Sequence, residues 1–256
     1  MLHSILITGA TSGIGKGLAL HYAKSGIHLF LTGRDAERLN EIKKLCEGKG
    51  AKVTIAAMDI TEKEKVNDWI LQCDSELPID LVIANAGVST SSLGEKPGTQ
   101  SLEAQRKLIH INIEGVLNTI FPILPRMQQR HSGQIALMSS MSAFRGLPRS
   151  PAYSASKAFL KTYGEGMGAR WRKEGIYFST ICPGFVETPL TDKNISKFSM
   201  PFKITVNQAV NYIAKGIAKR KVIIPFPWQM HWICYFLSIL PTRLTQMILS
   251  KAGSGV

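Results

Sequence analysis

Continuous apolar segments that alternate with helical patterns constrain the fold of this 256-residue chain more than any other feature. Seven of them lack the polar–apolar alternation of a half-exposed strand, which is typical of parallel strands covered on both faces. They are SILIT (4–8), HLFLT (28–32), KVTIAAM (52–58), DLVIAN (80–85), QIALMS (134–139), YFSTIC (177–182) and KVIIP (221–225). Their alternation with helices predicts an α/β fold, a doubly wound, seven-stranded parallel sheet with helices on both faces.

Capping residues mark the ends of two intervening helices. DAERLNEIKKLCEG opens with Asp35, a preferred N-cap, and closes at Gly48, a preferred C-terminal residue. TEKEKVNDWILQC opens with Thr61, and Glu64 stands at capping-box spacing from it. Since no repeat, low-complexity tract or linker interrupts the pattern, we expect a single domain over residues 1–256.

A glycine-rich turn, LITGATSGIGKG, follows the first predicted strand and opens a helix. Gly9, Gly13 and Gly15 permit a tight turn and a close approach of the backbone to a pyrophosphate. The helix N-terminus then offers N–H groups to the anion. A glycine-rich turn without a ligand is the alternative, but the strand–turn–helix context favours a dinucleotide site.

Tyr153 and Lys157 lie four residues apart in PAYSASKAFL and therefore share one face of a helix. A free tyrosine, with a pKa near ~10, is a poor base at neutral pH, and a nearby ammonium favours the phenolate. The alternative is a solvated surface pair. The small residues Ser154, Ala155 and Ser156 would let this helix lie against a cofactor.

These motifs together resemble the short-chain dehydrogenase/reductase family in its short, single-domain form, over about residues 4–190. They are Thr-Gly-x-x-x-Gly-x-Gly at the first turn, ANAG (84–87), a serine after the fifth strand, Tyr-x-x-x-Lys, and Pro-Gly-x-x-x-Thr (183–188). The resemblance implies a Rossmann fold and hydride transfer between a nicotinamide cofactor and a carbonyl or alcohol.

The resemblance also implies a catalytic tetrad of Asn112, Ser140, Tyr153 and Lys157. In it Tyr153 is the general acid/base, Lys157 lowers its pKa and holds the ribose hydroxyls, Ser140 positions the carbonyl, and Asn112 supports a water relay. By itself Asn112 would be an unremarkable helix residue. Strand alternation points Ser139 and Ser140 to opposite sides, and Ser142 is a reserve candidate for Ser140.

Cofactor-binding residues follow from the same resemblance. They are Gly9, Thr11, Ser12, Gly13, Ile14, Gly15, Arg34, Asp59, Ile60, Asn85, Ala86, Gly87, Tyr153, Lys157, Pro183, Gly184, Val186 and Thr188. Gly33 stands where NAD-selective members carry an acid, and the guanidinium of Arg34 can pair with a 2′-phosphate, so NADP(H) is the expected cofactor. Arg38 could assist or be solvated. Asp59 is the candidate for the adenine amino group, with a plain turn former as its alternative.

Two segments carry the substrate and assembly hypotheses. Residues 189–205 correspond to the family's substrate lid, and Phe198, Met200, Pro201 and Phe202 indicate an apolar substrate or simple packing of the lid. Met141, Phe144 and Leu147 are further candidates for the pocket wall. Residues 226–256 form a helical extension that departs from the commonest family ending.

The extension places Trp228, Trp232, Tyr235, Phe236 and Ile239 on one helical face, for which core or subunit packing is favoured over membrane contact. Because Pro225 and Pro227 interrupt the apolar stretch 222–240, we expect a buried helix rather than a transmembrane one. A homodimer or homotetramer is expected, with peripheral membrane contact through this segment as the lesser alternative.

Bulk properties exclude few partners. The net charge of +13 suits an anionic ligand, nucleic acid or an acidic membrane surface. Because the sequence contains no recognised nucleic-acid-binding motif, we do not expect nucleic acid as a partner. The four cysteines lack Cys-x-x-Cys spacing, which argues against a metal site and favours a reducing compartment. Without a signal-peptide pattern, a cytoplasmic location is expected.

The sequence thus predicts an NADP(H)-dependent oxidoreductase that interconverts an apolar carbonyl and an alcohol. The alternative from another class is a non-catalytic dinucleotide-binding protein that acts as a redox sensor or scaffold.

Overall fold

A seven-stranded, all-parallel sheet forms the centre of the molecule in the computed structural model, which describes residues 2–94, 101–192 and 201–253. The strand order is β3-β2-β1-β4-β5-β6-β7, so the predicted doubly wound sheet is confirmed. The strands are β1 (Ser4–Thr8), β2 (His28–Gly33), β3 (Lys52–Ala57), β4 (Leu81–Ala84), β5 (Gly133–Met138), β6 (Ile176–Pro183) and β7 (Ile223–Phe226). Each corresponds to one of the predicted apolar segments, with ends that differ by at most two residues.

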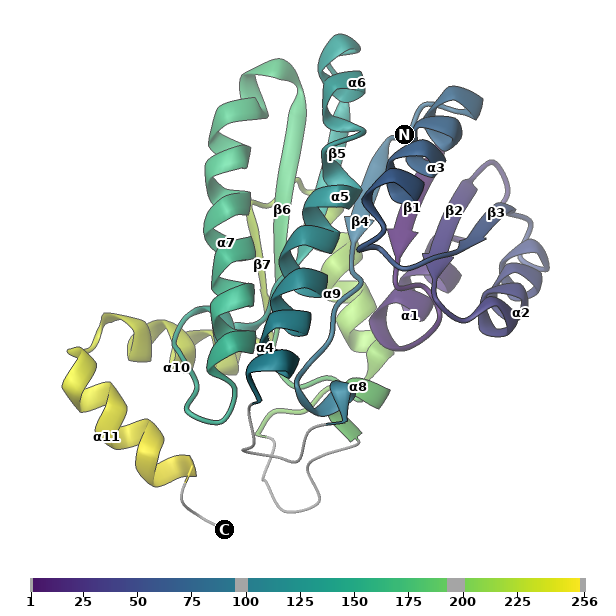
Figure 1. The fold of residues 1–256 in the computed structure, drawn as a ribbon. Helices are drawn as coiled ribbons and strands as arrows, with labels where there is room; N and C mark the ends of the chain where they lie inside the picture. The colour runs from purple at the N-terminus through teal and green to yellow at the C-terminus, as the bar shows by residue number, and fades with distance from the viewer. Residues whose placement is uncertain (1, 95–100, 193–200, 254–256) are drawn as a thin grey trace.

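Helices cover both faces of this sheet, as Figure 1 shows. They are α1 (Gly13–Tyr22), α2 (Ala36–Glu47), α3 (Lys63–Glu76), α4 (Leu102–Ile109), α5 (Gly115–Ile120), α6 (Leu124–Gln129), α7 (Pro151–Trp171), α8 (Pro189–Asp192), α9 (Val206–Ala218), α10 (Trp228–Ile239) and α11 (Thr242–Gly253). Short helical turns are η1 (Ser91–Leu93), η2 (His110–Glu114), η3 (Met141–Ala143) and η4 (Arg172–Glu174).

Alternate side chains of β1 enter the two halves of the core. Ile5 and Ile7 join a buried cluster with residues of α1, α2 and α9, whereas Leu6 joins a second cluster with residues of α3, α5 and α7. Since every β1 side chain is fully or nearly fully buried, no polar face is left, which explains the continuous apolar pattern of the sequence.

The connection order reverses beside β1. The chain winds from β1 out to β3 on one side, and then returns to β4 on the other side of β1. In an open parallel sheet this reversal leaves a crevice at the carboxyl ends of the strands. The residues that follow β1 and β4 therefore meet at one place, although 77 positions separate Thr8 from Asn85, whose amide donates to the Thr8 carbonyl.

A long helical run, Leu102–Gln129, contains α4, η2, α5 and α6. Among the described residues it is the one helix with the length and apolar composition to cross a membrane. Half of its apolar stretch is buried inside the protein, and Val116 and Ile120 belong to the core cluster under α3 and α7. The run therefore serves here as a core helix.

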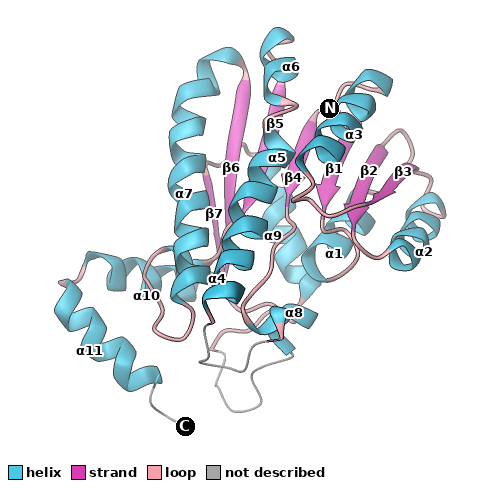
Figure 2. Cartoon of the chain, in the orientation of Figure 1, coloured by secondary structure: helices cyan, strands magenta, loops and turns pink. Residues whose placement is uncertain are grey.

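The C-terminal extension is helical as predicted, but its burial differs from the prediction. Figure 2 shows that α10 and α11 leave the body of the domain beside the lower end of α7. Of the α10 residues only Met230 is buried, while Trp228 and Trp232 are 65% and 60% exposed. The expected buried helix over 222–240 is therefore wrong. Only a narrow side of α10 packs against the domain. The aromatic side chains of α10 stand on the opposite side and therefore stay exposed.

Candidate active site

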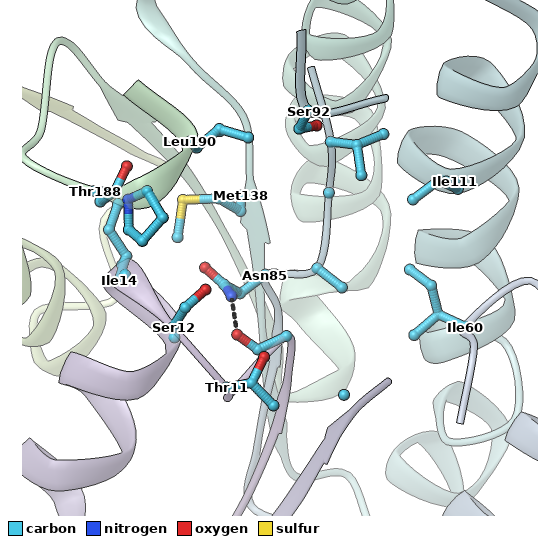
Figure 3. Close-up of a pocket in the computed structure, with 18 of the residues that line it drawn as sticks. Thr11, Ser12, Ile14, Ile60, Asn85, Ser92, Ile111, Met138, Thr188 and Leu190 are labelled. Carbon is cyan, nitrogen blue, oxygen red and sulfur yellow. Dashed lines mark hydrogen bonds between the residues drawn. The ribbon is translucent and has the colours of Figure 1, made fainter. Parts of the chain in front are cut away.

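A cleft of about 380 Å³ lies at the carboxyl ends of the strands, at the reversal point beside β1 (Figure 3). Sixteen of the eighteen predicted cofactor residues line it. They are Gly9, Thr11, Ser12, Gly13, Ile14, Gly15, Arg34, Asp59, Ile60, Asn85, Ala86, Gly87, Tyr153, Lys157, Pro183 and Thr188. One tertiary arrangement therefore gathers motifs that are spread over 180 residues of sequence.

The glycine-rich turn has room for backbone alone. A Cβ on Gly15 would stand 2.1 Å from the Gly9 carbonyl oxygen and 2.5 Å from Asn85 Nδ2. Gly9 and Gly13 have φ angles of +66° and +52°, a region that glycine adopts readily. This turn delivers the N-terminus of α1 to the cleft, where free N–H groups suit a pyrophosphate.

Asn85 holds the turn in place. Its Nδ2 donates to the carbonyl oxygens of Thr8 and Gly9 at 2.9 and 3.1 Å, and Figure 3 shows the amide directed at the turn. The Thr8 hydroxyl returns the contact by accepting from the backbone N–H groups of Asn85 and Ala86, each at 3.1 Å. These hydrogen bonds join the end of β4 to the glycine-rich turn after β1.

The end of β2 is shaped for a residue without a side chain. A Cβ on Gly33 would stand 2.7 Å from the γ-methyl of Thr11, so Thr11 occupies the space that an acid at position 33 would need. Arg34, the next residue, is exposed and lines the cleft. Arg38 points elsewhere, because its Nε pairs with Asp35 at 3.2 Å, and Asp35 caps α2 as predicted.

Asp59 both lines the cleft and stabilises the turn after β3. It lines the cleft, and its Oδ1 accepts from the backbone N–H and the hydroxyl of Thr61 at 2.9 and 2.8 Å. Partial burial alone would raise the pKa of Asp59, but these hydrogen bonds, aided by the charge of Arg34, hold it below its ordinary value. The predicted cap at Thr61 is wrong, since α3 begins at Lys63 and Thr61 is committed to Asp59.

Tyr153 and Lys157 lie on the same face of α7, and both line the cleft. The Lys157 ammonium is 5.6 Å from the centroid of the Tyr153 ring and donates to the Met138 carbonyl at 2.9 Å. Burial lowers the pKa of Lys157 to about 8. Burial raises the pKa of Tyr153, and a hydrogen bond with Ser140 opposes that rise.

Two adjacent serines after β5 diverge, as strand geometry predicts. Ser140 hydrogen-bonds Tyr153, and its oxygen also accepts from the backbone N–H of Ser142 at 3.1 Å. Ser139 turns the other way, and its hydroxyl donates to the Lys157 carbonyl at 2.7 Å. Ser140 is therefore the hydroxyl beside the phenol, although the residues that line the cleft include Ser139, which also joins the strand to α7, and not Ser140.

Asn112 is fully buried in the π-helical turn η2 and lies behind the cleft. Its Nδ2 donates to the Val88 carbonyl at 2.9 Å and to the Ser156 hydroxyl at 3.1 Å, and its Oδ1 accepts from the Val88 N–H at 2.8 Å. A Cβ on Gly87 would stand 3.1 Å from Asn112 Oδ1 and 3.2 Å from Lys157 Nζ. Gly87 thus lies between the amide and the ammonium.

Two of the small residues between Tyr153 and Lys157 make contacts within the protein. Ser156 is buried against Asn112, and Ser154 is buried and accepts from the Leu147 N–H at 3.2 Å. Ala155 is exposed. Contacts within the protein therefore favour a small side chain at Ser154 and at Ser156, and the approach of this helix to a cofactor stays a prediction.

Two predicted cofactor residues lie outside the cleft lining. The Val186 side chain packs in the core below, because its backbone pairs with Ile204. Gly184 faces α10: a Cβ there would stand 3.2 Å from Pro227 and 3.3 Å from Met230. Its lack of a side chain therefore serves the close approach of α10.

The predicted apolar residues of the substrate pocket do not line the cleft where the structure describes them. Phe198 and Met200 of the expected lid lie outside the described residues, and Phe202 is 45% exposed. The candidates Met141, Phe144 and Leu147 do not belong to the cleft lining found among the described residues. The Phe144 ring instead packs against His231 of α10, with 5.7 Å between centroids.

Several cleft residues escaped the sequence analysis. They are Met58, Val88, Ser92, Ile111 and Met138, whereas Pro189 and Leu190 belong to the expected lid over 189–205. Val88 and Met138 stand directly beside identified motifs, so their proximity was a usable signal. Ser92 and Ile111 reach the cleft only through the path of the chain after β4, which no local pattern encodes (Figure 3).

Comparisons with known proteins agree with this geometry. The family model for short chain dehydrogenase matches residues 3–198. An uncharacterized oxidoreductase of Myxococcus xanthus is 35% identical over 95% of this chain and 91% of its own length. Two solved structures share the fold. A short-chain dehydrogenase from Sphingobium yanoikuyae in complex with NADPH has a TM-score of 0.79 and 24% identity, covering 98% of this chain and 94% of that one. ElxO with NADP bound has a TM-score of 0.77 and 25% identity, and the match covers 88% of this chain and 98% of that one.

The fold and site define a dinucleotide-dependent oxidoreductase with a Tyr-x-x-x-Lys centre. The chain belongs to the short-chain dehydrogenase/reductase family.

Proposed function

We propose that this protein is an NADP(H)-dependent oxidoreductase that interconverts a carbonyl and an alcohol on an apolar substrate, with Tyr153 as the general acid/base. The observation that carries the proposal is the position of Tyr153, which lines the cleft beside the Ser140 hydroxyl and the Lys157 ammonium.

The cleft fits a dinucleotide on its own geometry. The turn at Gly15 leaves no space for a Cβ, and α1 begins at the cleft, so backbone N–H groups there would hold the pyrophosphate. A nicotinamide cofactor supplies the hydride in such enzymes. The rest of the chemistry belongs to the side chains of this chain.

Proton transfer centres on the Tyr153 hydroxyl. In carbonyl reduction it would donate a proton to the developing alkoxide, and in alcohol oxidation its phenolate would accept one. Because burial raises its pKa, Tyr153 needs stabilisation of the anionic form. Lys157 supplies a positive charge from the same helix face, and Ser140 supplies a hydrogen bond.

Asn112 would act one step further from the reaction. Its amide fixes the Val88 backbone next to Gly87, which lies against Lys157 Nζ. We propose that this contact keeps the ammonium beside the cleft and leaves space for a relay water.

The preference for NADP(H) is supported by the end of β2. Thr11 fills the space next to Gly33, and Arg34 places an exposed guanidinium at the cleft, suited to a 2′-phosphate. ElxO, similar to this chain at 25% identity, binds NADP. An apolar substrate is supported by Val88, Ile111 and Leu190 in the cleft wall.

Turnover of Tyr153→Phe tests the proposal against the non-catalytic alternative. Wild-type protein is screened with NADPH against apolar aldehydes and ketones, and the variant should retain NADPH binding but lose turnover by roughly 10²–10⁴-fold. Tyr163→Phe, ten residues further along α7 and stacked on Phe159, is the matched control and should keep full activity. NADPH binding by wild type without turnover of any carbonyl would favour the redox sensor or scaffold.

A further inference from the structure

The outer face of the C-terminal helices exposes large apolar side chains that the proposed reaction does not use. Its side chains are 44–65% exposed. They are Trp228, Trp232, Phe236 and Ile239 of α10, with Leu244 and Met247 of α11. We call this set the C-terminal face. Soluble monomers rarely expose a contiguous apolar patch of this kind, so the face is expected to have a partner.

The composition of the face is that of a membrane interface. Tryptophan and tyrosine prefer the boundary between water and hydrocarbon, because their rings are apolar but carry one polar atom. Trp228, Trp232 and Tyr235 all stand on the exposed side of α10. Helices that expose tryptophan, phenylalanine and leucine to one side lie in the plane of a bilayer surface.

The charge of the C-terminal helices distinguishes between two candidate partners, a lipid surface and a second copy of the chain. Residues 228–253, which contain α10 and α11, hold two Lys or Arg residues, Arg243 and Lys251, and none of the 18 Asp and Glu residues. Arg243 stands exposed at the start of α11, next to Leu244 of the face. A contact between two copies of this segment would oppose like charges with no acid of the segment to pair them, whereas an anionic lipid surface complements them.

The extension is attached to the substrate end of the active site. Arg145, in the loop after Ser140, donates to the Leu240 carbonyl at 2.7 Å and to the Thr245 hydroxyl at 3.0 Å. The inner side of α10 places Met230 against Gly184. Figure 1 shows α10 and α11 at the same end of the molecule as α8, beyond the carboxyl ends of the strands. Whatever binds the C-terminal face therefore lies near the mouth of the cleft.

We propose that α10 and α11 form an interfacial anchor that binds the surface of an anionic bilayer through the C-terminal face. The anchor lays aromatic and aliphatic side chains among the lipid headgroups, while Arg243 pairs with lipid phosphate. Binding itself does not depend on the proposed reaction. Only its use, the entry of an apolar substrate from the lipid, rests on the proposed function.

Vesicle flotation of the full chain tests the proposal. Wild type should float with vesicles of phosphatidylcholine and phosphatidylglycerol, bind pure phosphatidylcholine less, and release in high salt. The double variant Trp232→Ser/Phe236→Ser should bind at least about tenfold more weakly, because it removes two large apolar side chains from the face. Phe121→Ser, which removes a 53% exposed aromatic residue from the long helical run Leu102–Gln129, outside the C-terminal face, is the matched control and should float like wild type.

Two further measurements separate lipid binding from self-association and misfolding. Thermal unfolding of each variant establishes that it is folded, and brominated lipid should quench tryptophan fluorescence in wild type more than in Trp228→Phe/Trp232→Phe. The proposal is overturned if wild type stays in the aqueous fraction. It is also overturned if the double variant converts an oligomer to a monomer while vesicle binding is absent, because the face would then join copies of this chain. Loss of turnover with intact flotation would count against the proposed function alone.

Discussion

The side-chain amide of Asn112 satisfies both backbone groups of Val88, accepting from its N–H at 2.8 Å and donating to its carbonyl at 2.9 Å. These two hydrogen bonds resemble those that a neighbouring strand would make with Val88, and they join the turn η2 to the loop after β4. They also explain why a π-helical turn persists in a core helix, since that turn aims the buried amide at Val88.

Asn112→Asp is expected to destabilise the protein by about 2–4 kcal/mol, because a carboxylate buried at this site cannot donate to Val88 or Ser156. Urea unfolding measures the loss. Asn118→Asp is the matched control. Asn118 is half-buried and its side chain donates one hydrogen bond, to the Ile60 carbonyl, so this substitution should lower stability less. If both variants lost the same free energy of unfolding, the hydrogen bonds between Asn112 and Val88 would contribute no more to stability than the single bond of Asn118.

Gly15→Ala is expected to weaken NADPH binding at least tenfold and to lower stability by about 1–3 kcal/mol, because its Cβ would collide with the Gly9 carbonyl. Fluorescence titration and thermal unfolding give the two quantities. Gly166→Ala in α7 has open space around its Cβ and is expected to leave binding unchanged. An unaltered affinity in Gly15→Ala would contradict the assignment of this turn to the cofactor.

Cofactor preference is expected to depend on Arg34. Arg34→Ala should raise the KM for NADPH about tenfold or more and change that for NADH less than about twofold, since only NADPH carries the 2′-phosphate. Arg38→Ala is a close control, because this guanidinium pairs with Asp35 at the start of α2. If both cofactors respond equally to Arg34→Ala, the guanidinium does not read the phosphate.

Lys157 gives the stability of the cofactor-free protein a specific pH dependence. Its pKa is about 8 in the folded protein and 10.5 as the ordinary value, so between these pH values the unfolded chain binds more protons and stability rises with pH. The difference in unfolding free energy between wild type and Lys157→Met should therefore shift toward wild type from pH 7.5 to 9.5. One proton is worth about 1.4 kcal/mol per pH unit, so the shift is on the order of 1–2 kcal/mol.

The comparison with Lys157→Met is needed because buried thiols act in the opposite direction. Burial raises the pKa of Cys73 and of Cys182 to about 12, so both destabilise the folded state as pH rises above the ordinary thiol value. Both proteins retain these thiols, so the difference cancels Cys73; for Cys182 the charge of Lys157 is only the smallest of the influences on its pKa. A constant difference across the pH range would show that Lys157 is not desolvated.

Arg145 is expected to fasten α11. Arg145→Ala removes the hydrogen bonds to Leu240 and Thr245, and hydrogen exchange in α11 should become at least several-fold faster. Arg149→Ala, on an exposed residue of the same loop, should leave exchange unchanged. Unaltered exchange in Arg145→Ala would mean that packing alone holds the helix.

Local physics accounts for what the sequence by itself determined. Continuous burial on both faces of a parallel strand produced the seven apolar segments, and the pitch of a helix set Tyr153 and Lys157 on one face. Gly15 was recognisable because a turn that approaches a phosphate excludes a Cβ. Each of these features is a relation between residues a few positions apart.

Only the tertiary structure decided the features that depend on distant partners. Thr61 has a good capping pattern but is taken by Asp59, and Ser156 is small because Asn112 packs on it from 44 residues away. The aromatic face of α10 has the periodicity of a buried helix, yet its Trp232 side is exposed. Periodicity indicates that a helix has an apolar side, but burial depends on which other segment reaches that side. The inner side of α10 is met by β7 and η3.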